Sequence, residues 1–136
     1  MSNRKLLVLD LDETLIHARE TPLERAEDFR ALDYFVYRRP HLAHFLDTVA
    51  QHFELGVWTS SGHLYAQAVV AQVFAPYPLR FVWSNRRCTI VRDWQTDRQV
   101  ELKSLAKLKR HGWSLDHLIA VDDTPAKHAR NYGNLV

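Results

Sequence analysis

The sequence contains one cysteine, Cys88, and no apolar run long enough to cross a lipid bilayer. A lone cysteine cannot form an internal disulfide, so a reducing compartment is expected and the cytoplasm is the default prediction. The longest apolar runs, within residues 5–9 and 118–121, fall far short of the roughly 20 residues of a transmembrane helix. An acidic residue, Asp10, arrives too early for a secretory signal. We therefore predict a cytoplasmic protein with no membrane partner.

The chain also lacks a strong excess of either charge. Its 136 residues carry 18 Lys and Arg against 16 Asp and Glu, a formal net charge of +2. This mild balance argues against a dedicated nucleic-acid binder, although it is compatible with an anionic substrate. Internal repeats, low-complexity tracts and flexible linkers are also missing. Because 46% of the residues are hydrophobic, we expect one folded domain over residues 1–136.

What is present is an alternation of apolar strands with amphipathic helices. This order predicts a three-layer α/β/α domain with a central parallel sheet and a small β insertion. The insertion is expected as a hairpin within residues 88–100, and residues 21–33 as a surface segment. Predicted strands are residues 5–10, 34–37, 53–59, 79–83 and 118–121, and predicted helices are residues 40–51, 63–73 and 101–110.

Polar side chains follow three of these strands at the point where each strand ends. They lie in residues 10–14, 59–62 and 122–124. Ligands of parallel α/β sheets bind beside the carboxyl ends of the strands. The three segments are therefore expected to meet in one cleft.

The first of these segments has the residues that phosphoryl transfer needs. Asp10 ends a buried strand, so its carboxylate can attack phosphorus and form an acyl phosphate. Asp12 can protonate the leaving alkoxide and then deprotonate a water molecule. Thr14 can donate its hydroxyl to a phosphate oxygen. Lys103 can supply a fixed positive charge to the nucleophile and the phosphate.

Several carboxylates beside a phosphate repel one another, and a hard divalent cation offsets this repulsion. Mg²⁺ prefers oxygen ligands, and Asp10, Asp123 and the backbone carbonyl of Asp12 can supply them. Asp122 would then hold a metal-bound water. Thr59 and Ser60 offer hydroxyl and N–H donors at the positive end of the helix that follows them.

A family resemblance rests on the residues at 10–17, Asp-Leu-Asp-Glu-Thr-Leu-Ile-His. This segment resembles the first motif of the haloacid dehalogenase superfamily of aspartate-based phosphatases. More narrowly, it resembles the branch with the phosphatases of the RNA polymerase II C-terminal domain and the NLI-interacting factor-like proteins. Further matches are Arg39-Pro40-His41, Val57-Trp58-Thr59-Ser60, Lys103 and Val121-Asp122-Asp123-Thr124-Pro125.

The resemblance implies Asp10 as nucleophile, Asp12 as acid and base, Thr59 and Lys103 as phosphate ligands, and Asp10, Asp12 and Asp123 around Mg²⁺. Relatives that act on the polymerase tail recognise a phosphoserine beside proline. They use a pocket in the segment after the second motif, which is Val57-Trp58-Thr59-Ser60 here. That segment is short here, and Trp83 and Trp94 are the candidate pocket residues. Relatives usually continue with another strand and helix, so either the chain is trimmed or its sheet edge is completed differently.

Three functions stay open at this stage. The first is a phosphatase acting on phosphoserine or phosphothreonine of a protein or peptide. The second is a phosphatase of small metabolites or nucleotides with the same chemistry. The third is a phosphate-binding module without activity, which the intact set of Asp10, Asp12, Thr14, Lys103 and Asp123 disfavours. Cys88 is expected to be a packed residue, because no activating base is evident near it in the sequence.

Overall fold

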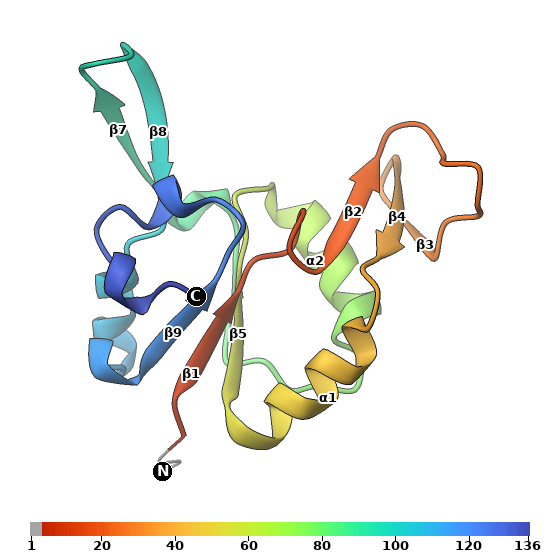
Figure 1. Ribbon diagram of the computed structural model, residues 1–136, viewed down its shortest axis with the longest axis horizontal. Helices are drawn as coiled ribbons and strands as arrows, with labels where there is room; N and C mark the ends of the chain where they lie inside the picture. Colours follow the sequence, from red (N-terminus) through yellow and green to blue (C-terminus); the bar gives the residue numbers. More distant parts are fainter. Residues whose placement is uncertain (1–3) are drawn as a thin grey trace.

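A four-stranded parallel sheet forms the centre of the computed structural model, which describes residues 4–136 (Figure 1). Its strands are β1 (Leu6–Leu9), β5 (Glu54–Trp58), β6 (Val82–Trp83) and β9 (Leu118–Val121). They lie in the order β6-β5-β1-β9, so the first and last strands of the chain are neighbours. The fold is therefore the predicted α/β type.

Strand β1 lies between β5 and β9, and all four of its residues are buried. Leu7 and Leu9 pack into one hydrophobic cluster, whereas Leu6 and Val8 pack into a second. This division follows from the pleat, because successive side chains of a strand point to opposite faces. An unbroken apolar run is thus what a strand covered on both faces requires.

The two faces of the sheet are covered by different kinds of helix. Helices α1 (Leu42–His52) and α2 (His63–Val73) contribute buried residues to the cluster of Leu7 and Leu9. The opposite cluster contains Leu105 and Leu108 of the 3₁₀ segment η2 (Leu105–His111). The other 3₁₀ segments are η1 (Asn85–Arg87), η3 (Leu115–His117), η4 (Pro125–His128) and η5 (Tyr132–Asn134).

Two small antiparallel sheets extend from this body in different directions (Figure 1). Strands β2 (Ile16–Arg19), β3 (Phe29–Ala31) and β4 (Tyr34–Arg38) form one, in the order β2-β4-β3. Strands β7 (Thr89–Asp93) and β8 (Arg98–Leu102) form a hairpin that projects from the body. The hairpin confirms the insertion expected within residues 88–100.

Two expectations for secondary structure were wrong. The helix expected over residues 101–110 is a strand end followed by the 3₁₀ segment, because Leu102 pairs with Thr89 in the hairpin. Pro40 lies outside α1, which begins at Leu42 after His41 at φ 66°. The segment 21–33 lies at the surface as expected, since only Ala31 in it is buried, but it also contains β3, whose pairing with β4 is a tertiary contact rather than a local preference.

At the other edge of the sheet, Leu135 forms a parallel bridge with Ala120 of β9. The amide of Val136 donates to the carbonyl oxygen of Ala120 at 2.8 Å. Residues beyond η5 therefore run alongside β9. Among residues 4–136, no helix is both long enough and apolar enough to span a membrane.

Candidate active site

The turn after β1 brings Thr14 back over Asp10. The carbonyl oxygen of Leu11 accepts hydrogen bonds from the amides of Thr14 and Leu15 at 3.2 and 2.9 Å. Glu13, just before Thr14, has φ 63°. Leu11 and Leu15 are buried and anchor the turn in the core. As a result the Thr14 hydroxyl donates to Asp10 Oδ2 at 3.0 Å. In this structure Thr14 therefore orients the predicted nucleophile.

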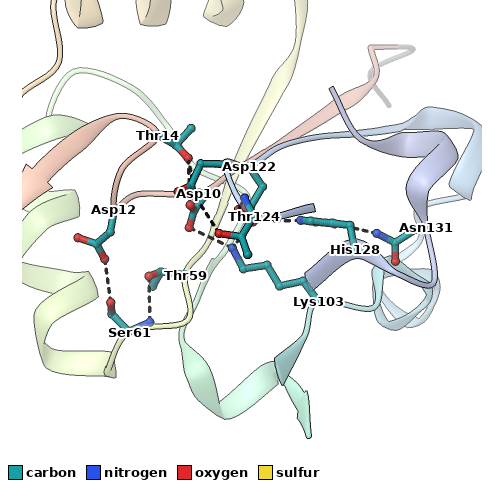
Figure 2. A network of polar contacts seen from close by, with 11 residues as sticks. Asp10, Asp12, Thr14, Thr59, Ser61, Lys103, Asp122, Thr124, His128 and Asn131 are labelled. Carbon is teal, nitrogen blue, oxygen red and sulfur yellow. Dashed lines mark hydrogen bonds and ion pairs between the residues drawn. The ribbon is translucent and has the colours of Figure 1, made fainter. Parts of the chain in front are cut away.

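Lys103 lies between β8 and η2, and its buried ammonium group joins two carboxylates (Figure 2). Its Nζ donates to Asp10 Oδ1 at 3.0 Å and to Asp122 Oδ2 at 2.5 Å. Asp10 follows β1 and Asp122 follows β9, and the Asp10 amide donates to the carbonyl oxygen of Val121 at 3.0 Å. The parallel register of β1 and β9 thus places both carboxylates at one end of the sheet.

The two carboxyl groups bound to Lys103 differ in acidity. Burial raises the pKa of Asp10 to about 7, although the charge of Lys103 opposes the rise. Burial acts on Asp122 in the same direction. There, the hydrogen bond from His128 and the charge of Lys103 outweigh it and hold the pKa of Asp122 well below its usual range. Asp122 is therefore a fixed anion, whereas Asp10 is the carboxylate whose charge is easily changed.

Three carboxylates at this rim fit a divalent cation. One oxygen from each of Asp10, Asp122 and Asp123 lies within 4.8 Å of the others. The Asp122 oxygens already accept hydrogen bonds from Lys103, His128 and the Thr124 amide. Asp10 and Asp123 are thus the better direct ligands, and a hard cation such as Mg²⁺ suits their oxygens.

Asp12 points away from this cluster (Figure 2). Its Oδ2 accepts from the Ser61 hydroxyl at 2.8 Å and its Oδ1 from the Tyr65 hydroxyl at 2.6 Å. Burial and then the hydrogen bond to Asp12 raise the pKa of Tyr65, so this phenol stays a donor. Asp12 lines a pocket of about 430 Å³ together with Tyr34 and Tyr65. The structure does not place the Asp12 carboxylate in the cluster of possible metal ligands.

The two hydroxyl residues after β5 have different surroundings. Thr59 is buried, and its Oγ1 accepts the Ser61 amide at 3.0 Å, which leaves its own hydroxyl hydrogen available to a ligand. The Ser60 hydroxyl is also buried, but it lies beside the thiol of Cys88. Burial raises the pKa of Cys88, so the thiol stays protonated and does not act as a nucleophile.

A buried chain of hydrogen bonds behind Asp122 was missed by the sequence analysis. His128 Nε2 lies 3.1 Å from Asp122 Oδ2, and its Nδ1 lies 2.7 Å from Asn131 Nδ2. The amide of Leu105 donates to Asn131 Oδ1 at 3.1 Å, so the Asn131 nitrogen must be the donor to His128. The proton of His128 is therefore on Nε2 and points at Asp122. The sequence signal, a histidine six residues after an aspartate, is too common to single out.

The two tryptophans named as candidate pocket residues lie in different environments. Trp83 is buried at the end of β6, with its ring centroid 5.0 Å from that of Trp58. Trp94 is 84% exposed and lies between β7 and β8, in the hairpin that projects from the body (Figure 1).

Solved structures with a similar fold include two of the phosphatase Fcp1. The fission yeast RNA polymerase II CTD phosphatase Fcp1, bound to beryllium fluoride, superposes with a TM-score of 0.73 and 21% identity. The match covers 98% of this chain and 40% of that one. A second structure, titled as Fcp1, an essential RNA polymerase II CTD phosphatase, gives a TM-score of 0.71 and 22% identity. At this level of identity the likeness shows the fold.

Similar curated proteins carry names that refer to the nuclear envelope. The CTD nuclear envelope phosphatase 1 homolog of Drosophila melanogaster is 41% identical over 81 residues, which are 48% of this chain and 33% of that protein. The nuclear envelope morphology protein 1 of Saccharomyces cerevisiae is 29% identical over 150 residues, 98% of this chain and 34% of that protein. The chain thus spans about a third of the length of these relatives.

These names contradict the predicted cytoplasmic location, which was wrong. The prediction depended on a single unpaired cysteine. Such a residue suits any reducing compartment, so the cysteine count cannot distinguish the cytoplasm from the others.

A family model described as NLI interacting factor-like phosphatase matches residues 5–136. The match includes the turn after β1, Lys103 and the Asp122–Asp123 pair, which the fold brings to one rim. It agrees with the resemblance that the matching segments of the sequence indicated. The chain belongs to the family of NLI interacting factor-like phosphatases.

Proposed function

We propose that this chain is a single catalytic domain of a magnesium-dependent phosphatase that hydrolyses phosphoserine or phosphothreonine in a protein through an aspartyl phosphate on Asp10. One observation carries the proposal. The Asp10 carboxylate lies 3.0 Å from the buried Lys103 ammonium and within 4.8 Å of oxygens of Asp122 and Asp123. One cluster thus contains a candidate nucleophile, a fixed positive charge and carboxylate ligands for a metal ion.

In the first step, an Asp10 oxygen attacks phosphorus and the bond from phosphorus to the serine oxygen breaks. The serine oxygen takes a proton from Asp12, whose carboxyl group lines the pocket of Tyr34 and Tyr65. The products are an unphosphorylated serine side chain in the substrate protein and an aspartyl phosphate on Asp10. Hydrogen bonds from Thr14 and Lys103 fix the orientation of Asp10 during the attack.

In the second step, a water molecule gives a proton to Asp12 and its oxygen attacks phosphorus. The bond from phosphorus to the Asp10 oxygen breaks, inorganic phosphate leaves and the carboxylate is restored. Lys103 and the free hydroxyl hydrogen of Thr59 are suited to the phosphate oxygens in both steps. Asp122, held by His128, keeps Lys103 in place.

Asp10 and Asp123, with the backbone carbonyl of Asp12, are the proposed ligands of Mg²⁺, and Asp122 is proposed to hold one of its water molecules. The bound cation would neutralise charge on the transferred phosphoryl group. The protein substrate is supported by the family and by relatives that are named as CTD phosphatases. Small phosphate esters can reach the same cluster, so they serve as probes of the chemistry.

The direct test is hydrolysis of para-nitrophenyl phosphate by the purified chain. We expect turnover with Mg²⁺, none in EDTA, and a loss of at least about 10³-fold in kcat for Asp10→Asn, because the nucleophile is removed. Asp116→Asn, which changes an exposed carboxylate elsewhere, is the matched control and should keep full activity. A wild-type chain that binds phosphate but turns over nothing would be a binding module instead.

The substrate class needs a separate comparison. Phosphopeptides, nucleotides and sugar phosphates are offered to the wild-type chain, and kcat/KM is measured for each. We expect phosphoserine or phosphothreonine peptides to lead. A lead for nucleotides or sugar phosphates would overturn the protein substrate while leaving the chemistry of Asp10 standing.

A further inference from the structure

Five basic side chains surround one hollow outside the cluster of Asp10. The hollow has a volume of about 450 Å³, and its lining includes Arg86, Arg87, Lys107, Arg110 and His111. We call these five residues the basic pocket. No carboxylate lines it. The net charge of the whole chain is only +2, so this concentration of cations is local.

The cations of the basic pocket are not neutralised by the protein itself. Ion pairs within 4.0 Å among residues 4–136 involve other basic side chains, and none involves Arg86, Arg87, Lys107 or Arg110. Like charges held together repel one another, and an anion placed among them removes that cost. The charge pattern thus points to an anionic ligand.

The basic pocket is held in shape by the buried ring of Trp83. The guanidinium of Arg87 lies over this ring, 4.7 Å from its centroid, and the His111 ring meets it edge-on at 5.5 Å. On the other side, Lys107 Nζ donates to the carbonyl oxygen of Arg87 at 2.6 Å. Contacts therefore join η1 to η2 across the hollow, which limits the motion of its walls.

The walls of the basic pocket continue into the candidate active site. Ser104 lines the hollow and directly follows Lys103. On the opposite wall, the segment before Arg86 hydrogen-bonds to residues after β5: the Asn85 amide donates to the carbonyl oxygen of Ser61 at 2.9 Å. One wall of the basic pocket is thus joined to the candidate active site by a peptide bond and the other by a hydrogen bond.

We propose that the basic pocket binds a second phosphate group of the same protein substrate while the first is hydrolysed at Asp10. This inference rests on the proposed function. Guanidinium groups match phosphate with paired N–H donors, and Arg86, Arg87 and Arg110 provide three such groups. A hollow whose walls are joined to the candidate active site suits a group on the same flexible chain better than it suits a flat lipid surface.

The test compares singly and doubly phosphorylated peptides. The second phosphoserine is placed two to eight residues from the first, which covers roughly 7 to 28 Å of extended chain. For at least one spacing we expect kcat/KM to rise about tenfold over the singly phosphorylated peptide and the gain to shrink at high salt. Peptide binding to Asp10→Asn is measured in parallel, so that the basic pocket is tested even without turnover.

Charge reversals locate the effect. Arg86→Glu and Arg110→Glu should remove the gain from the second phosphate and leave hydrolysis of para-nitrophenyl phosphate unchanged. Lys109→Glu reverses the charge next to Arg110 on η2, exposed but outside the basic pocket, and should keep most of the gain. Equal losses in Lys109→Glu and Arg110→Glu would reduce the effect to general charge attraction and overturn the proposal.

Two further ligands complete the experiment. Single-stranded RNA and phosphatidylcholine vesicles containing phosphatidylserine are tested for binding to the wild-type chain and to Arg110→Glu. Binding that Arg110→Glu abolishes, together with no gain from a second phosphoserine at any spacing, would assign the basic pocket to that ligand instead. If no substrate is hydrolysed but the doubly phosphorylated peptide still binds more tightly than the singly phosphorylated one, the proposed function is rejected. The proposal for the basic pocket then stands.

Discussion

Asp10 and Asp122 bind the same ammonium group, yet their pKa values move in opposite directions. Asp122 accepts three hydrogen bonds from Lys103, His128 and the Thr124 amide, whereas Asp10 accepts two, from Lys103 and Thr14. The carboxylate with more hydrogen bonds is thus Asp122, and not the proposed nucleophile Asp10. Asp10 stays under-compensated, so a cation gains most by binding there.

The affinity for Mg²⁺ is therefore expected to depend on pH through Asp10. Its pKa in the metal-free chain is raised to about 7, so below that pH a proton occupies the carboxylate and competes with the cation. Affinity should fall as pH falls, by about tenfold between pH 8 and pH 6. Calorimetric titration with Mg²⁺ at several pH values measures this directly.

Asp10→Asn is the control for that titration. It cannot gain or lose a proton, so its weaker Mg²⁺ affinity should be flat over the same range. A wild-type affinity that stays constant from about pH 6 to 8 would contradict the raised pKa of Asp10.

His128 is expected to matter for stability although it is remote from the proposed phosphate. His128→Ala leaves Asp122 without one donor and the Asn131 amide without its acceptor, both buried. The free energy of unfolding should fall by about 1–3 kcal/mol, measured by urea denaturation. His117→Ala, an exposed histidine, should change it by less than about 0.5 kcal/mol. Equal effects of the two substitutions would contradict the network.

At the scale of elements, β5 carries a glycine because a ring occupies the space beside it. A methyl group at Gly56 would lie 2.4 Å from a ring atom of Phe81. Gly56→Ala should therefore lower the free energy of unfolding by about 1–3 kcal/mol through overpacking. Gly133→Ala is the control, since nothing lies within 4 Å of its added methyl and its φ is not positive. Thermal unfolding of both variants decides the point.

Elements with a strong local pattern were the ones predicted from the sequence. β9 and α2 have the expected bounds, because an unbroken apolar run predicts the strand, whereas Gly62 before and Pro76 after the helix limit its length. β2 and β3 have four and three residues with mostly polar or half-buried side chains. Their pairing with β4 is decided by neighbours distant in sequence, which no local pattern records.

At the scale of the whole molecule, the parts of the candidate site that follow from a local sequence pattern were predicted, and the parts that depend on packing were not. Residues at strand ends were predicted to converge, and Asp10, Lys103, Asp122 and Asp123 do lie together. The partners Tyr65 and His128 were not foreseen, because one comes from the helix after the second motif and the other from η4. Which side chain completes a buried hydrogen bond depends on packing, and packing is not periodic in the sequence.

The pairing of β1 with β9 has a consequence for synthesis on the ribosome. Asp10 emerges early in translation, but its neighbours after β9 emerge more than a hundred residues later. A nascent chain therefore has a potential nucleophile long before it has the ammonium and carboxylate groups that surround it. Under the proposed mechanism, catalytic competence would arise only once the last central strand has formed, and translation products truncated before β9 are expected to be inert.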